Sequence, residues 1–328
     1  MQKSHLELSR RQAFKGTAAA GVSLAAAGLG SSAARAAAPL QGAERPSFYR
    51  FELGDFEVTT LFDGAVQLDG PHPIFGQNVE AGEVQDLAEQ NFLPREKMVI
   101  GFTPVIVNTG NQVVMFDSGN GAGRRPDAGK LASLLENAGF AASEVDIVVL
   151  THFHPDHIGG LMEDGSPLFE NATYVANEAE FDFWSAEDKL SGPTERVAKL
   201  TQSNVLPLSE KMSFIKDGGE VVSGITAIDA SGHTPGHTAF HLESAGDRLM
   251  VTADTANHYV VSLQRPDWHV RFDMDKDAAI ASRKKVFGMI AADRIPFTGY
   301  HMPFPAVGYV EAIDGGFRYV PASYQLDL

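Results

Sequence analysis

The 328-residue sequence contains no cysteine. No disulfide can therefore cross-link the fold, and any metal site must use histidine and carboxylate side chains in place of thiolates. Basic residues are also scarce, because 26 Lys and Arg stand against 42 Asp and Glu, which gives a formal net charge of −16. This acidic balance argues against nucleic acid or anionic membrane surfaces as partners and indicates a solvated acidic exterior.

The sequence also lacks a strongly apolar run of the roughly 20 residues that a membrane span needs. Its nearest candidate, residues 16–30, is rich in Ala and Gly and follows the twin-arginine motif Ser9-Arg10-Arg11-Gln12-Ala13-Phe14-Lys15. Small residues at Ala34-Arg35-Ala36 then suit a signal peptidase. We predict that residues 1–36 are a twin-arginine signal peptide, that the protein is periplasmic or secreted, and that no membrane anchor remains after cleavage.

Residues 37–328 are predicted to form one large domain with an ample core. Their net charge is about −20, because the leader removes five Lys/Arg and one Asp/Glu from the total of −16. Apolar periodicity predicts strands at residues 56–62, 99–108, 112–116, 145–150 and 295–298, short β runs from 213 to 253, and helices at 128–138, 177–185 and 276–291. Asp127 is the expected cap of the first helix. The elements follow the order strands, helix, strand and then strands, helix, strand. The chain could therefore form two αβ halves that pack sheet against sheet with the helices outside.

The segment Thr151-His152-Phe153-His154-Pro155-Asp156-His157 directly follows the apolar strand predicted at 145–150. It places three imidazoles and a carboxylate, all good ligands for a divalent cation, at the end of a buried strand. The spacing is too tight for one ion to use all four side chains. We therefore predict two adjacent ions, with His152 and His154 serving one and Asp156 and His157 the other. The alternative is a polar turn that is rich in His by chance.

Three downstream segments supply further candidate ligands. A Gly/Pro-rich turn, Gly232-His233-Thr234-Pro235-Gly236-His237, carries two imidazoles, while Asp254 and His301 each follow a predicted strand. A lone Asp at a strand end is more often a cap than a ligand. Together with the first motif, however, these side chains complete two coordination shells.

At this point the sequence resembles the metallo-β-lactamase superfamily, and within it most closely the methyl parathion hydrolase group and the acyl homoserine lactonases. The segment 152–157 fits the family motif H-x-H-x-D-H, and Asp117-Ser118-Gly119 fits the upstream D-[ST]-G. Further similarity lies in Leu53-Gly54-Asp55-Phe56-Glu57, in 232–238, in His301-Met302-Pro303-Phe304-Pro305 and in Phe317-Arg318-Tyr319-Val320-Pro321. The resemblance implies an α/β (α+β) fold, a four-layer αββα sandwich with a dinuclear site at its edge.

The resemblance also implies roles for individual side chains. One metal ion would be bound by His152, His154 and His233, the other by Asp156, His157 and His301, and both by Asp254. His237 would lie behind the ligands, and Asp117 would hold a ligand imidazole by its N–H, although a role as a turn residue fits Asp117 equally well. Zn²⁺ is the expected ion, and manganese, cobalt or iron would also fit His and carboxylate ligands.

A dinuclear site of this kind implies a hydrolase. Two cations would lower the pKa of a shared water, and the resulting hydroxide would attack a carbonyl or phosphoryl centre. Asp156 and Asp254 are the predicted catalytic residues. The expected substrates are lactones or esters, with N-acyl homoserine lactones as quorum-quenching targets, and the alternative is a phosphotriester. A metal-binding protein without catalysis is a third hypothesis, which the complete set of seven ligands disfavours. A homodimer is a family expectation only.

Four aromatic or imidazole side chains are candidates for the substrate pocket: Phe183 and Trp184 on the predicted helix after the metal motif, and His258 and Tyr259 after Asp254. Trp184 matches a pocket aromatic of the methyl parathion hydrolase group, although packing of that helix to the core explains it equally well. Aromatics found in that group are missing from 119–125 and 189–201. Their loss favours lactones over nitrophenyl phosphotriesters.

Overall fold

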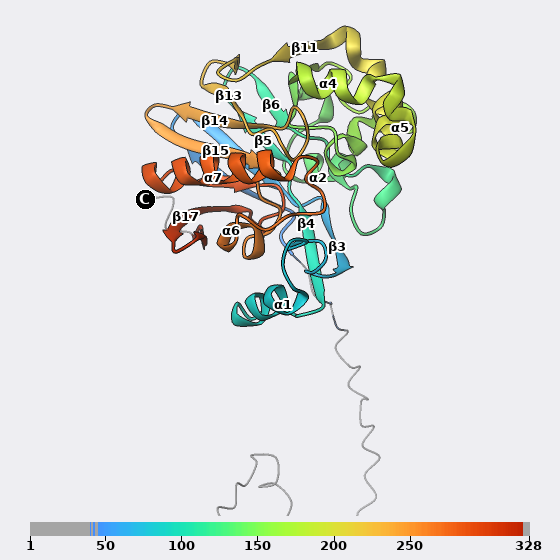
Figure 1. Cartoon of the computed structure of the whole chain (residues 1–328). Coiled ribbons are helices and arrows are strands. Elements are labelled where there is room, and N and C mark those ends of the chain that lie inside the picture. Colours follow the sequence, from blue (N-terminus) through green and yellow to red (C-terminus); the bar gives the residue numbers. More distant parts are fainter. Residues whose placement is uncertain (1–39, 41, 43–44, 324–328) are drawn as a thin grey trace, which may run out of the picture. The chain divides into compact units, whose positions relative to one another are not determined.

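Two seven-stranded β-sheets lie at the centre of the structure, a computed structural model that describes Leu40, Gly42 and residues 45–323. Arg45–Leu328 is one unit, and the predicted leader and cleavage site lie outside the described residues. Helices occur on the outer sides of the sheets (Figure 1). Among the described residues, no helix is long and apolar enough to cross a membrane.

The first sheet has the strand order β1-β2-β5-β6-β7-β10-β11. Its strands are β1 Phe48–Leu53, β2 Phe56–Leu61, β5 Val105–Asn108, β6 Val113–Phe116, β7 Ile147–Leu150, β10 Thr173–Asn177 and β11 Met212–Ile215. Strand β7 runs parallel to both of its neighbours, β6 and β10, and all four of its residues are buried. A parallel strand covered on both faces explains the continuous apolar sequence of β7.

The second sheet has the order β12-β13-β14-β15-β16-β17-β18. Its strands are β12 Glu220–Val222, β13 Ile225–Asp229, β14 Thr238–Ser244, β15 Asp247–Ala253, β16 Phe297–Gly299, β17 Val307–Ile313 and β18 Gly316–Pro321. Two small sheets are added, β3 Gly64–Asp69 with β4 Lys97–Phe102, and β8 Met162–Glu163 with β9 Ser166–Pro167. Strands β15 and β16 are parallel, so their carboxyl ends point the same way.

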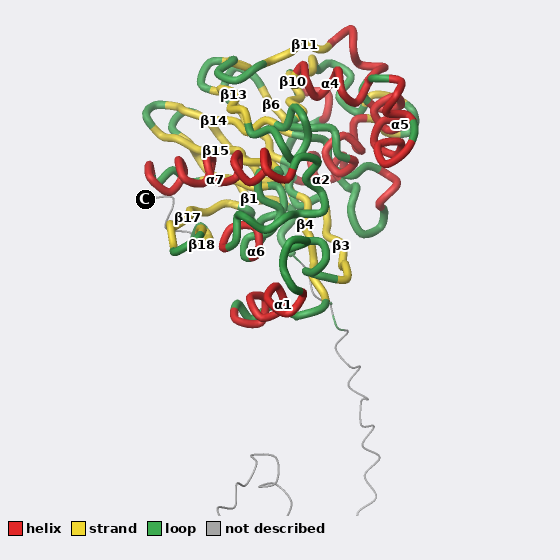
Figure 2. The backbone as a smooth tube through the Cα atoms, viewed as in Figure 1, coloured by secondary structure: helices red, strands yellow, loops and turns green. Residues whose placement is uncertain are grey.

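Figure 2 shows the helices in red: α1 Ala81–Gln90, α2 Leu131–Asn137, α3 Pro155–Ile158, α4 Glu178–Ser185, α5 Glu195–Asn204, α6 Val261–Gln264 and α7 Lys276–Asp293. Short 3-10 turns occur at Ala122–Arg124, Ala142–Glu144, Gly159–Leu161, Glu187–Leu190, Gly192–Thr194 and Leu206–Lys211. Side chains of α2, α4 and α5 share a core cluster with the outer face of the first sheet. Helix α7 packs through Val286, Phe287 and Ile290 against the second.

A third cluster fills the space between the two sheets, where Val58, Val107 and Val149 share a core with Phe240 and Leu249. The layers are therefore helices, sheet, sheet and helix, which confirms the predicted αββα sandwich. Burial of this apolar layer between the two sheets stabilises the fold.

Two local predictions were wrong. The single strand predicted at 99–108 is divided, because Pro104 offers no N–H to a ladder: β4 pairs with β3, and β5 pairs with β2. The helix predicted at 128–138 begins only at Leu131, and Lys130, not Asp127, occupies its N-cap position. The prediction for 177–185 is confirmed, since the side chain of Asn177 caps α4 by accepting from the Ala179 N–H.

Candidate metal centre

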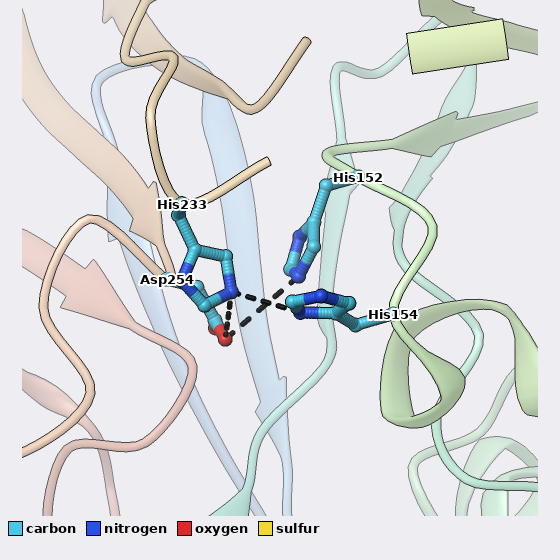
Figure 3. A group of neighbouring side chains, drawn as sticks. All are labelled: His152, His154, His233 and Asp254. Carbon is cyan, nitrogen blue, oxygen red and sulfur yellow. Dashed lines mark hydrogen bonds and ion pairs between the residues drawn. The ribbon is translucent and has the colours of Figure 1, made fainter. Parts of the chain in front are cut away.

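The side chains of His152, His154, His233 and Asp254 converge on one point (Figure 3). The candidate ligand atoms of these four side chains lie within 4.8 Å of one another. The side chains of Asp156, His157 and His301 form a second group, whose candidate ligand atoms also lie within 4.8 Å of one another. His152 lies two residues after the end of β7, and Asp254 and His301 follow β15 and β16. The carboxyl ends of strands from both sheets thus deliver all seven predicted ligands to one edge of the sandwich.

Asp254 lies between the two groups. Its Oδ2 atom is 3.2 Å from His233 Nε2 and 3.1 Å from His301 Nε2, and its Oδ1 atom is 3.3 Å from His157 Nε2. The backbone just before it is irregular, because Ala253 has a φ of +43° and the register of β15 with β16 shifts there. This conformation, unfavourable for a residue with a Cβ, is one that proteins retain at functional sites.

Several polar atoms of the cluster are buried without a hydrogen-bond partner among the described residues, namely His152 Nε2, His157 Nε2 and Asp254 Oδ1. Unpaired buried polar atoms are costly, and here they all belong to good metal ligands. The donor set therefore fits two divalent metal ions, whose binding would satisfy these atoms.

The electrostatics of the cluster divide its imidazoles, because the pKa values of His152 and His154 are lowered whereas those of His157, His233 and His301 are raised. Burial, reinforced by neighbouring imidazoles, holds the pKa of His152 and of His154 well below the ordinary value, so both are neutral ligands. Burial alone would raise the pKa of Asp254, but His301 and His157 outweigh it and hold that pKa well below its usual range. Burial likewise lowers the pKa of His233, but hydrogen bonds with Asp254 and Asp273 outweigh it and raise that pKa to about 9.

Groups behind the ligands fix the orientation of the rings. Asp117 Oδ2 lies 2.8 Å from His157 Nδ1 and accepts from the Thr151 hydroxyl, so Asp117 contacts the imidazole of a candidate ligand. His237 has its Nδ1 atom 3.0 Å from the Ala230 carbonyl oxygen, and its Nε2 atom accepts from the Asp254 N–H. Both ring nitrogens of His237 are engaged, so it supports the ligands from behind.

The loop carrying His233 is pressed between two helices. A Cβ added to Gly232 would lie 2.1 Å from the Ala279 nitrogen in α7, and one added to Gly236 would lie 2.4 Å from the Glu180 nitrogen in α4. Only glycine permits such a close approach. The buried Glu180 carboxylate accepts from the N–H groups of Phe153 and Gly236. It therefore connects the segment that carries His152 and His154 to the loop that carries His233.

The four pocket candidates separate into two pairs. His258 and Tyr259 line a cavity of about 1070 Å³ that also reaches His301. Phe183 and Trp184 are not among the residues that line it. Trp184 is only 2% exposed, donates to Glu180 and packs its ring edge-to-face against His154 at 6.2 Å, so it supports a ligand from the core side.

Sequence reasoning missed four buried residues around the ligands: Asn257, whose amide donates to Asp254, and Glu180, Asp273 and Arg283. A signal was present for Arg283. It lies on the same helical stripe as Ala279, Val286 and Phe287, which are all buried, and an arginine in such a stripe requires a buried anion. Asp273, which accepts from the Arg283 guanidinium, is that anion.

Known proteins share this fold and sequence pattern. A family model described as the metallo-beta-lactamase superfamily matches residues 103–296. An N-acyl homoserine lactonase of a Bacillus species is 21% identical over 248 residues, which are 72% of this chain and 90% of the lactonase. AidC, a dizinc quorum-quenching lactonase solved with the product N-hexanoyl-L-homoserine, is 26% identical with a TM-score of 0.77, over 85% of this chain and 98% of AidC.

A second solved structure, the hydrolase AbOPH of the beta lactamase superfamily, is 24% identical with a TM-score of 0.79, over 86% of this chain and 99% of AbOPH. This similarity shows that the two chains share a fold. The family model itself spans more than half of the sequence, and the layered sandwich agrees with it. The chain therefore belongs to the metallo-beta-lactamase superfamily of hydrolases.

Proposed function

We propose that this protein hydrolyses lactones, with N-acyl homoserine lactones as its substrates, at a centre that holds two divalent metal ions. The observation that carries the proposal is the cavity of about 1070 Å³, which extends from His301 over the β3–β4 ribbon to α1. A substrate in it would present its ring to the ligand cluster and its acyl chain to the apolar walls. The similarity to lactonases at 21% and 26% identity supports the same class.

In this proposal one ion is held by His152, His154 and His233, the other by Asp156, His157 and His301, and Asp254 contacts both. Zn²⁺ suits this set of imidazoles and carboxylates. When bound, such a pair of ions lowers the pKa of a water molecule toward neutrality and polarises a carbonyl group. The chain's own contribution is to keep these side chains in place and to admit the substrate.

Several residues carry out that positioning. The Asn257 amide donates to Asp254 Oδ2 at 2.9 Å and fixes its plane. The Tyr300 hydroxyl donates to the Asp156 carbonyl, and the Tyr300 ring lies 3.9 Å from that of His157, centroid to centroid. His301 has its Nδ1 atom 2.8 Å from the Gly101 carbonyl oxygen, so its Nε2 atom is the one that faces Asp254 Oδ2, at 3.1 Å. Fixed ring orientations of this kind raise the affinity of a metal site.

The cavity is polar at its ligand end and mainly apolar beyond it. Asn257 and His258 lie with His301 at the polar end, and the polar or charged side chains of Arg45, Gln67, Arg95, Glu96 and Lys97 also line the cavity. The apolar lining includes Phe62, Ala65, Leu93, Met98, Ile100, Val261, Met302 and Phe304. Burial lowers the pKa of His258 to about 4, and its Nδ1 atom accepts from the Val260 N–H. His258 is therefore neutral with its proton on Nε2, a hydrogen-bond donor suited to an acyl carbonyl.

We expect purified enzyme to open N-dodecanoyl homoserine lactone with a kcat/KM at least about tenfold above that for the N-butanoyl compound, because burying each further CH₂ contributes about 0.8 kcal/mol. Steady-state assays on both, with dihydrocoumarin and methyl parathion alongside, test this. A kcat/KM for methyl parathion above that for every lactone would assign the enzyme to phosphotriesters instead.

A second prediction concerns the cavity wall. Ala65→Phe places a ring in the cavity, so we expect kcat/KM for the N-dodecanoyl substrate to fall about tenfold or more, with little change for N-butanoyl, as expected for lost burial of two or more CH₂ groups. Ala312→Phe, the same change at an exposed position of β17, is the matched control. Equal losses for both substrates in Ala65→Phe would remove the cavity from the proposal.

A further inference from the structure

A buried ion pair lies behind His233. The Arg283 guanidinium in α7 is fully buried, and its Nη2 atom donates to Asp273 Oδ2 at 2.8 Å. Asp273 is only 3% exposed. Burying two charges is expensive unless every polar atom finds a partner, and a hydrophobic pair of similar size is often as stable. The remaining hydrogen bonds of the pair therefore point to what it does.

Those bonds lead to the candidate ligands. The second carboxylate oxygen, Asp273 Oδ1, lies 2.9 Å from His233 Nδ1. Because a carboxylate only accepts, the proton of His233 is on Nδ1, and Nε2 is the atom that faces His154 and Asp254 at 2.9 and 3.2 Å. One carboxylate thus holds the ring orientation and the tautomer that a metal ligand needs.

Arg283 contacts the loop of the shared carboxylate at the same time. Its Nε atom donates to the Thr255 carbonyl at 2.9 Å, directly after Asp254, and its Nη1 atom donates to the Pro266 carbonyl at 3.0 Å. The N–H groups of Met274 and Asp275, which follow Asp273, both donate to the Gly232 carbonyl beside His233. The ion pair is therefore connected to two ligand-bearing loops.

We propose that Asp273 and Arg283 are positioning residues that set the metal affinity of the group formed by His152, His154, His233 and Asp254. The inference rests on the proposed metal centre. Asp117 has the corresponding position behind His157 in the other group, so each group has its own buried carboxylate. Mutation of such a carboxylate behind a metal ligand typically lowers the metal affinity about 10- to 100-fold.

Asp273→Asn is the informative change, because it keeps the volume and replaces one acceptor by a donor. Arg283 has only donors, so the Asn oxygen turns toward it and the NH₂ group faces His233. His233 Nδ1 must then accept, and its proton moves to Nε2, the nitrogen that should bind the ion. We expect the apparent dissociation constant of one Co²⁺ to rise about 10- to 100-fold while the other changes little.

The experiment titrates metal-free wild type, Asp273→Asn and Asp117→Asn with Co²⁺ in competition with a chelator, and records the hyperfine-shifted imidazole N–H signals by NMR. Asp273→Asn should lose the His233 Nδ1–H signal and weaken the binding of one of the two Co²⁺ ions. Asp117→Asn, the matched control, should instead lose the His157 Nδ1–H signal and weaken the binding of the other Co²⁺ ion. The melting temperatures of the metal-free proteins show whether each variant is folded.

Two results would overturn the inference: a folded Asp273→Asn variant with both dissociation constants and all N–H signals unchanged, or equal weakening of both ions together with a large drop in melting temperature. If Asp273→Asn fails to fold, Asp273→Glu must keep both the signal and tight binding, and its loss of either would also count against the inference. A wild-type protein that binds no Co²⁺ would instead remove the proposed metal centre itself.

Discussion

Asp254→Ala should reduce the kcat/KM for lactone hydrolysis by more than about 100-fold and should leave at most one metal ion per chain. Loss of a residue that only supports a ligand from behind typically costs up to about 100-fold. The reason lies in its contacts: its two oxygens face His233, His301 and His157 within 3.3 Å, so its removal takes one ligand from both groups at once. The variant also leaves the Asn257 amide without its acceptor.

The measurement is metal content by elemental analysis together with kcat/KM on N-dodecanoyl homoserine lactone. Asp146→Ala is the matched control, since Asp146 is an exposed carboxylate next to β7 at the end opposite the cluster, where it accepts from the Val113 N–H. It should retain two ions and full activity. Two ions per chain in a folded Asp254→Ala variant would show that the assignment of this carboxylate is wrong.

Complete removal of metal ions should abolish hydrolysis, and two equivalents of Zn²⁺ should restore it. In the absence of metal ions His152 Nε2, His157 Nε2 and Asp254 Oδ1 are buried without hydrogen-bond partners among the described residues, so binding should also stabilise the fold. At a free ion concentration 100 times the dissociation constant, each site adds about 2.7 kcal/mol to the free energy of unfolding. Full activity after exhaustive chelation, verified by elemental analysis, would exclude a metal-dependent mechanism.

The same titration should release protons. The pKa of His233 is raised to about 9 by its hydrogen bonds with Asp254 and Asp273, so in addition to the proton on Nδ1 the ring without metal ions carries a proton on Nε2 at neutral pH. A cation must displace it, so the apparent affinity for Zn²⁺ should increase as pH rises from 7 toward 9. Isothermal titration calorimetry in buffers of different ionisation enthalpy counts the protons released, and a count of zero at pH 7 would contradict this prediction.

Local sequence signals predicted most of the strands and helices and the ligand-rich segment 152–157, because each signal is contained within a few residues, whereas the four-layer arrangement and the full set of seven side chains were expected from the resemblance to the family. The buried strand β7 is a continuous apolar run, and Asn177 and Gly232 are residues whose type suits a cap and a close approach. The four side chains of 152–157 are adjacent in sequence, so their convergence needs no long-range information.

Features that depend on tertiary contacts were not predictable in the same way. The cavity is built from β3, β4, α1 and residues near 258 and 302, segments that no short motif connects. Trp184 was equally compatible with a pocket wall and with core packing, and only the position of α4 decides for the core. Asp273 is a single carboxylate in a loop, and its partners lie 10 and 40 residues away.

The division of the ligands between the two sheets has a consequence for how the enzyme matures. Four of the seven side chains follow β7, and the other three follow strands β13, β15 and β16. Neither half of the sandwich holds enough groups for a complete pair of ion sites. If the proposed metal centre is correct, a chain whose two sheets have not packed together cannot hold both ions, so binding of the full pair requires the assembled sandwich.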